Sequence, residues 1–204
     1  MKSDVFETEL NYIKNERIRE SAKFLLEKLP DYFYTMPAST SGKYHPAFSL
    51  GEGGLVRHTK AAVRIAVELF RDSIFNTFEY GEKTQDLIIM TLLLHDGFKQ
   101  GKEDAGHTAY DHPLIAAHFV FENITKLPMD ALDALQVKRL IASHMGPWNT
   151  DKTGKIVLPV PKCDDEIFVH LCDYMASRNF LNINFVNNEI TDSVVRGQAR
   201  TLRK

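Results

Sequence analysis

Histidine and aspartate side chains suited to binding a metal ion occur in five separate blocks of the chain. The six residues are His58, His95, Asp96, His112, His144 and Asp173. Most of them begin or end otherwise apolar stretches with helical periodicity, where an imidazole or a carboxylate is costly to bury unless a partner compensates it. A divalent metal ion held by nitrogen and oxygen atoms would compensate several of these groups at once.

A single histidine at the end of a helix is more often a capping residue or a hydrogen-bonded core residue than a metal ligand. The set as a whole favours metal binding, because without an ion several buried titratable groups would need separate partners. We assign no ligand role to His45 and His107, which lie in polar loops, or to His118 in mid-helix. His170 lies one turn before Asp173 and could orient that carboxylate through a hydrogen bond.

The types of donor limit the identity of the metal. Imidazole and carboxylate ligands suit Mn²⁺, Fe²⁺, Co²⁺, Ni²⁺ or Zn²⁺, and the order of affinities alone does not choose among them. The two cysteines, Cys163 and Cys172, form no CxxC pair, which argues against a thiolate zinc site and fits a reducing compartment. We therefore expect one or two divalent transition-metal ions per chain, without sulfur ligands.

The hydrophobic periodicity predicts helices along nearly the whole chain. A short arm over 149–162 could form a β-hairpin near 150–160. On the helix expected over 55–70, His58 faces inward and Lys60 falls on the opposite, polar side. The predicted helices span 7–29, 55–70, 84–95, 112–124, 130–144 and a segment from about 164 that carries Asp173, with an irregular segment over 31–54.

These elements predict an all-α protein with six or more helices around the metal centre and at most one small hairpin. The chain has 204 residues, of which 44% are hydrophobic and 25% charged, so it is long enough for one sizeable core. We expect a single domain over 1–204. Its parts are an N-terminal helix and irregular segment over 1–47, a metal-binding helical core over 48–180 and a C-terminal extension over 181–204.

The distribution of charge and apolar residues excludes some partners. The formal net charge of −2 gives no basic field of the kind that drives bulk nucleic-acid binding, but it is compatible with a small nucleotide or a short strand end. The first twenty residues carry charges throughout, and no apolar run approaches the roughly 18 residues needed to span a bilayer. We therefore predict a cytoplasmic protein without a membrane partner.

In order and context, the five blocks resemble the HD superfamily of metal-dependent phosphohydrolases over roughly residues 48–180. That superfamily has an all-helical fold and is named for an adjacent His-Asp pair, which LLLHDGFK matches. The Gly-Gly-Leu-x-x-His-Thr and Ser-His-x-Gly sequences are most similar to the HD domain of the bacterial 3′-to-5′ exoribonuclease type. The resemblance implies a first metal held by His58 in GGLVRHT, His95, Asp96 and Asp173 in HLCDYMASR, and a second held with His112 in DHP and His144 in ASHMG.

The resemblance also implies a reaction. Asp96 would bridge two ions with its two oxygens, and the ions would activate water for attack on a phosphate ester and hold the phosphoryl oxygens. Lys99 matches a lysine three residues after the aspartate of the pair, where it would neutralise charge on those oxygens. The alternative is that Lys99 is a cation favoured by the C-terminal end of a helix dipole. Asp96 and Lys99 are the expected catalytic residues.

Substrate binding is expected from loops. The loops span 36–54, 97–111 and 146–162. His107 could donate a proton to the leaving group, and Trp148, the only tryptophan, could stack on a nucleobase. The alternatives are that His107 lies in a solvated connector and that Trp148 covers a helix end. Arg178 is the third candidate for substrate binding.

Three classes of function stay open. The favoured one is a phosphohydrolase that acts on a nucleotide or a related small phosphate ester. The second is a 3′-to-5′ exonuclease, which would shorten a labelled oligonucleotide processively, or a cyclic-nucleotide phosphodiesterase. The third is a di-iron oxygenase with the same order of ligands, which would be coloured, contain iron and consume oxygen. A homodimer is compatible with each of them.

Overall fold

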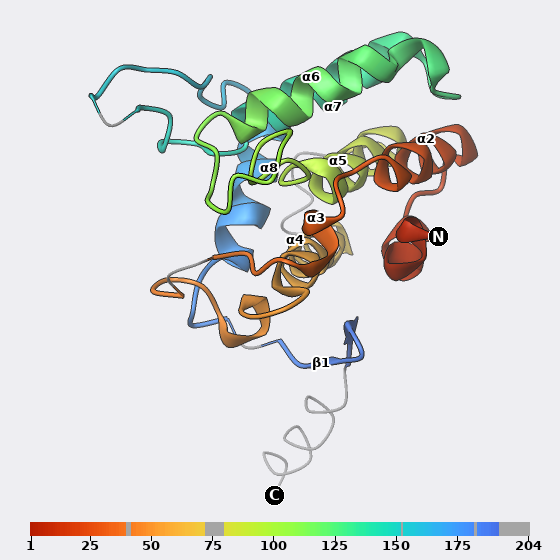
Figure 1. Cartoon of the computed structure of the whole chain (residues 1–204). Coiled ribbons are helices and arrows are strands. Elements are labelled where there is room, and N and C mark those ends of the chain that lie inside the picture. The colour runs from red at the N-terminus through yellow and green to blue at the C-terminus, as the bar shows by residue number, and fades with distance from the viewer. Residues whose placement is uncertain (40–41, 72–79, 152, 182, 192–204) are drawn as a thin grey trace, which may run out of the picture.

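The computed structural model describes residues 1–39, 42–71, 80–151, 153–181 and 183–191. Most of this part of the chain is helical, and the helices lie in layers (Figure 1). The α-helices are α1 (Glu7–Leu10), α2 (Glu16–Glu27), α3 (Tyr32–Thr35), α4 (Gly54–Arg71), α5 (Glu82–Leu94), α6 (His112–Asn123), α7 (Ala131–Ser143) and α8 (Asp164–Ala176). Shorter elements are the 3-10 helices η1 (Lys2–Phe6), η2 (Ala47–Ser49) and η4 (Ile124–Lys126) and the strands β1 (Phe185–Val186) and β2 (Glu189–Ile190).

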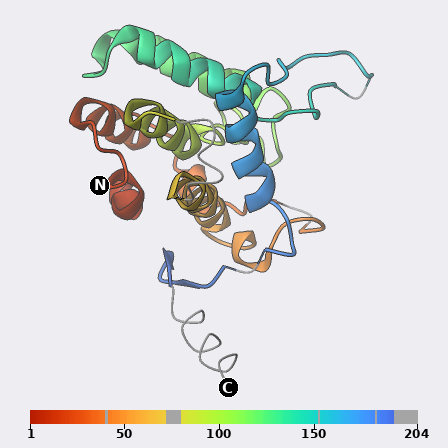
Figure 2. The same cartoon turned by 180° about the vertical axis from the view of Figure 1, so that it is seen from behind.

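Helix α5 occupies the centre of the fold because its sequence is apolar on all sides after the first turn. Every residue from Asp86 to Leu94 is buried. It packs against α2, α4, α7 and α8, and α6 lies beside α7. Figure 2 shows α8 running across the ends of these layers, where it contacts α4, α5 and α7. The C-terminal end of α5 is thus enclosed by other helices.

The single helix predicted over 7–29 is wrong, because the chain forms α1, breaks, and begins again as α2. Asn15 caps α2: its Oδ1 accepts hydrogen bonds from the backbone N–H groups two and three residues further on, at 3.0 and 3.3 Å. The Asp86 carboxylate of α5 accepts hydrogen bonds from the backbone N–H groups of Lys14 and Asn15, at 2.9 and 2.8 Å. A side chain distant in sequence therefore holds the break in place.

The helix predicted over 55–70 forms as α4, and its start is fixed by a close approach to η2. A Cβ atom on Gly54 would lie 2.2 Å from the carbonyl oxygen of Ser49. Only glycine leaves room for the backbone of η2 at this point. The approach sets the direction in which α4 leaves the loop and therefore the position of its second turn, which carries His58.

Lys60 of α4 is buried, and the prediction that it lies on a polar, outward side is wrong. Its Nζ lies 3.1 Å from Glu9 Oε2 of α1 and 2.7 Å from Glu189 Oε1 of β2. The ring centre of Phe6 lies 5.8 Å from the same Nζ. Segments from both ends of the described chain thus cover this side of α4 and neutralise the charge.

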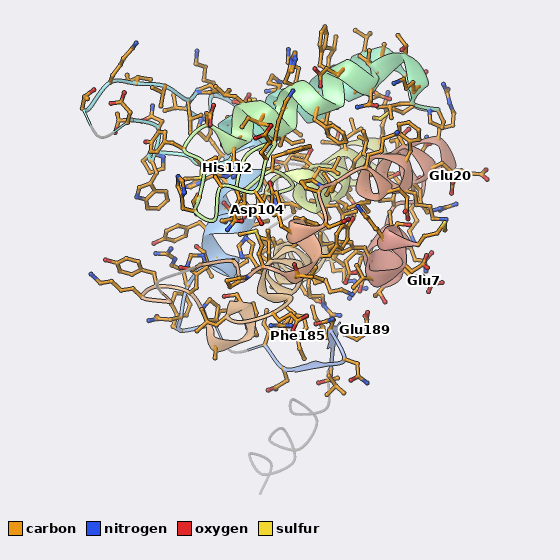
Figure 3. All side chains as sticks on the ribbon, viewed as in Figure 1. Glu7, Glu20, Asp104, His112, Phe185 and Glu189 are labelled. Atoms are coloured by element: carbon orange, nitrogen blue, oxygen red, sulfur yellow. The ribbon has the colours of Figure 1, made fainter. Side chains whose placement is uncertain are left out.

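Strands β1 and β2 form a two-stranded antiparallel hairpin. Its turn residues, Asn187 and Asn188, have φ angles of 50° and 65°, in the left-handed region that such tight turns require. The Asn188 Oδ1 accepts a hydrogen bond from Arg57 Nη1 at 2.9 Å, which fixes the turn to α4. In Figure 3, Phe185 and Glu189 on this hairpin lie well away from His112 at the start of α6.

The all-α fold with one small hairpin is confirmed, although the hairpin lies after α8. In the predicted range 150–160, the described residues form only one isolated bridge, between Thr150 and Ile156. The end of the predicted C-terminal extension, residues 192–204, lies outside the described residues. Within the described ranges, no helix combines the length and apolar character needed to cross a membrane.

Candidate metal centre

The six predicted ligands meet in the interior, although they come from five different helices or from residues that directly follow them. Each lies at the start or the end of a helix, or on a helix that passes the C-terminal end of α5. They are His58 of α4, His95 and Asp96 directly after α5, His112 at the start of α6, His144 directly after α7 and Asp173 of α8.

The two oxygens of the Asp96 carboxylate face different pairs of histidines. Oδ2 lies 3.7 Å from Nε2 of His58 and 3.5 Å from Nε2 of His95. Oδ1 lies 3.0 Å from Nε2 of His112 and 3.7 Å from Nε2 of His144. Asp96 therefore lies between two groups of donors and presents one oxygen to each.

The Asp173 carboxylate completes the first group. Its Oδ1 lies 3.0 Å from Nε2 of His58 and 3.5 Å from Nε2 of His95. Among the described residues, ligand atoms within 4.8 Å of one another define three overlapping triads, which are His58, His95 and Asp96; His95, His144 and Asp173; and Asp96, His112 and His144. Such spacing lets neighbouring residues hold a common ion.

Hydrogen bonds to the backbone fix the orientation of three histidine rings. Nδ1 of His95, His112 and His144 lies 2.7, 2.8 and 2.8 Å from the carbonyl oxygen three residues earlier. Because a carbonyl oxygen only accepts hydrogen bonds, Nδ1 carries a proton in each ring, and Nε2 is the nitrogen that faces the cluster. Burial, together with the neighbouring His95, lowers the pKa of His144 to about 3, so this ring is neutral, as a ligand must be.

Two imidazole nitrogens in the cluster are buried without a hydrogen-bond partner among the described residues. They are Nε2 of His95 and Nδ1 of His58. Leaving a polar atom unpaired in the interior is costly. A metal ion at Nε2 of His95 would remove that cost, and four imidazoles with two carboxylates are a donor set that divalent transition metals accept. The residues present therefore fit such an ion.

Both carboxyl groups are ionised in the interior. Burial alone would raise the pKa of Asp96, but the charges of Lys99 and His95 hold it well below its ordinary value. Burial opposes ionisation of Asp173 too, and the hydrogen bond to His58 together with the neighbouring imidazole of His95 holds its pKa well below its ordinary value. The cluster thus offers two negative charges to a cation at neutral pH.

A cavity of about 160 Å³ adjoins the cluster. Lys99 lies on its wall, is 13% exposed, and donates a hydrogen bond from Nζ to Asp96 Oδ2. Trp148 and Arg178, two of the predicted substrate-binding residues, also line the cavity. The third, His107, is exposed, does not line it, and its Nδ1 bonds the carbonyl of Ala105 in its own loop at 2.8 Å.

Two other histidines lie near the cluster, and one of them makes a different contact from the predicted one. His170 does not bond Asp173; its Nδ1 donates to the carbonyl oxygen of His144 at 2.7 Å. The ring reaches this position because Gly146 has no side chain: a Cβ there would lie 2.3 Å from Cε1 of His170. His45, which is not a predicted ligand, lines the cavity, and burial lowers its pKa to about 4. The only indication of this in the sequence is that His45 lies in the loop 36–54, which is predicted to bind substrate.

Comparison of the chain with protein-family models, with curated proteins and with solved structures finds no match. The resemblance to the HD superfamily therefore remains a prediction from the sequence motifs.

Proposed function

We propose that this protein is a metal-dependent phosphohydrolase that cleaves a phosphate ester of a nucleotide or a related small molecule. The observation that carries the proposal is the Asp96 carboxylate, with one oxygen facing His58 and His95 and the other facing His112 and His144. A carboxylate between two groups of donors is the arrangement expected of a bridging ligand in a two-metal site.

The residues divide into two ligand sets under this proposal. The first set is His58, His95, Asp96 and Asp173, and the second is Asp96, His112 and His144. Divalent ions bound there would supply Lewis-acid polarisation of a phosphoryl oxygen and a nucleophile at neutral pH. The protein orients the ligands through the backbone hydrogen bonds of the histidines and keeps the cluster almost free of bulk water.

Lys99 supplies a positive charge at the wall of the cavity. Its ammonium group contacts Asp96, so a phosphate group beside that carboxylate also lies beside the lysine. As charge grows on the phosphoryl oxygens during displacement, a fixed cation in this position stabilises them more than it stabilises the ground state.

The size of the cavity supports a small substrate. Its volume of about 160 Å³ is below the roughly 300–1,000 Å³ that encloses most drug-sized ligands. It can enclose the phosphate end of a substrate while the remainder lies at the mouth. The net charge of −2 also favours a single nucleotide over a long strand, whose binding depends on a basic surface.

The test combines metal analysis of protein purified without added metal with release of phosphate from a nucleotide panel in Mn²⁺, Co²⁺ and Ni²⁺. We expect about two metals per chain and turnover that a chelator removes and added metal restores. One metal or none, without turnover of any mononucleotide, would contradict the proposal and leave His112 and His144 as structural residues. Cleavage of oligonucleotides alone would favour the exonuclease.

Replacement of Lys99 by alanine separates its two interpretations. If the ammonium stabilises developing charge, kcat falls by about 10²- to 10³-fold, the loss typical of removing one such donor. If Lys99 is only a helix-end cation, turnover is unchanged and the protein is slightly less stable. Steady-state kinetics and thermal unfolding of the same preparation decide between the two.

Lys126 provides a matched control for Lys99→Ala. It lies in the last turn of η4 and does not line the cavity. Lys126→Ala should leave kcat unchanged, so an equal loss in both variants would show that the effect of Lys99→Ala is not specific to the site.

A further inference from the structure

We propose that Trp148, Tyr174 and Arg178 form a subsite that binds one nucleobase at the mouth of the cavity, so that the substrate is a mononucleotide. This inference rests on the proposed function for the phosphate end of the substrate. The inference itself concerns the nucleobase, which is the part of the substrate that is not cleaved. All three side chains line the same cavity as Asp96 and Lys99.

Trp148 is a half-exposed ring that is held in a fixed orientation. Its ring lies nearly parallel to that of Tyr174 on α8, with the centroids 5.7 Å apart and the planes at 13°. The ring of His170 approaches within 5.9 Å at 51°. Trp148 nevertheless remains 49% exposed. A single exposed aromatic residue needs no explanation, but a ring packed on two others beside a cavity provides a rigid surface on which a base can stack.

Arg178 supplies a charge next to this surface. Its guanidinium lies 4.4 Å from the ring centre of Tyr174 and 5.9 Å from that of Tyr44. Nε and Nη2 donate to Ser177 Oγ at 3.2 and 2.9 Å. In the described part of the chain the hydrogen bonds of this guanidinium go to a hydroxyl and none to a carboxylate, so it keeps its full charge and further N–H donors for an anion.

The combination of groups selects a nucleotide over other ligands that bind aromatic rings. A quaternary ammonium also binds to aromatic clusters, but the positive charge of Arg178 would repel it. A phosphorylated ligand with an aromatic part uses these groups together. The base covers Trp148, and the negatively charged phosphate is attracted by Lys99, which contacts Asp96, and by Arg178 on the same cavity. A single platform of this kind accommodates one base, whereas a strand-binding groove uses several rings along a basic track.

The experiment uses the intrinsic fluorescence of Trp148, since this is the only tryptophan in the chain. The purified protein with its own metal is mixed with adenosine 5′-monophosphate, and separately with ribose 5-phosphate and inorganic phosphate. Emission is recorded before turnover, with free tryptophan amide as the control for light absorbed by the base. We expect saturable quenching by the nucleotide and none by the two ligands that lack a base.

Substitutions provide an independent measurement. Trp148→Ala should raise KM for the nucleotide about tenfold, the loss expected from removing one stacked base, and leave KM for ribose 5-phosphate unchanged. Trp148→Phe should restore most of the affinity because it keeps an aromatic ring. Phe121 of α6 is 46% exposed and does not line the cavity, so Phe121→Ala is the control and should change neither KM.

The outcomes separate this inference from the proposed function. Turnover of phosphate esters without nucleotide quenching, or with equal KM changes for both substrates in Trp148→Ala, overturns the base subsite and leaves the phosphohydrolase standing. Quenching by the nucleotide without any turnover supports the subsite and contradicts the phosphohydrolase. Absence of both quenching and turnover overturns both proposals.

Discussion

Replacing Asp96 by asparagine is expected to lower the rate of phosphate release by about 10³-fold or more. The amide keeps the size of the side chain but removes the negative charge that lies between the two histidine pairs. Metal stabilisation of charge in the transition state amounts to several kcal/mol, and each 1.36 kcal/mol corresponds to a factor of ten. Phosphate release in the presence of added metal, and the metal content of the purified variant, measure the effect.

Asp133→Asn is the matched control for this variant. Asp133 on α7 is also largely buried, with 11% of its side chain exposed, and it pairs with Lys83 at 2.7 Å, but it belongs to none of the ligand triads. The control should keep normal turnover and metal content. If Asp96→Asn retained both and unfolded at the normal temperature, Asp96 would not be a bridging ligand.

The candidate metal centre was accessible to sequence reasoning because its residues are polar groups at the ends of apolar helices. His95 and Asp96 follow the fully buried residues of α5, and His144 follows α7 in the same way. A polar side chain at such a position is carried into the interior by the helix that precedes it. Helical periodicity is sufficient to recognise this pattern, and it predicts the direction of His58 on α4 equally well.

Loops limited what could be predicted about substrate binding. His45 and His107 are both histidines in polar loops, yet one lines the cavity and the other is exposed. Nothing in the local sequence distinguishes them, because the position of a loop depends on the elements against which it packs. The same limit applies to the break before Asn15, since the carboxylate of Asp86 that holds it comes from another helix.

Lys60 shows where helical periodicity itself fails. The helical periodicity correctly places Lys60 on a different side of α4 from His58. It does not show which segments of the chain cover that side. The covering residues are Glu9, near the N-terminus, and Glu189, which is 129 residues further along than Lys60. A lysine is almost never fully buried unless it is paired, so a sequence alone favours the solvent-exposed interpretation.

Lys60→Met is expected to lower the free energy of unfolding by about 3–5 kcal/mol, the range found when one partner of a buried ion pair is removed. Methionine keeps the length of the side chain but leaves the Glu9 carboxylate, which is 4% exposed, without its cation. Burial already raises the pKa of Glu9 above its ordinary value, and Lys60 opposes that rise. Without the lysine this pKa rises further, so the loss should be largest at neutral pH and shrink as acid protonates Glu9. Denaturant unfolding at neutral pH and at acidic pH measures the change.

The double variant Lys60→Met/Glu9→Gln tests the cause of that loss. It removes both buried charges and leaves Glu189, whose side chain is 49% exposed and can be solvated. Most of the stability should return, and the pH dependence should disappear, because replacing both members of a buried pair is often neutral. Lys23, which pairs with Glu20 on the surface of α2, is the control, and Lys23→Met should cost only about 0.2–0.5 kcal/mol. A loss as small in Lys60→Met would mean that Lys60 contributes no more than a surface ion pair. Packing and contacts such as the Arg57–Asn188 hydrogen bond would then hold the hairpin and the N-terminal helix to α4.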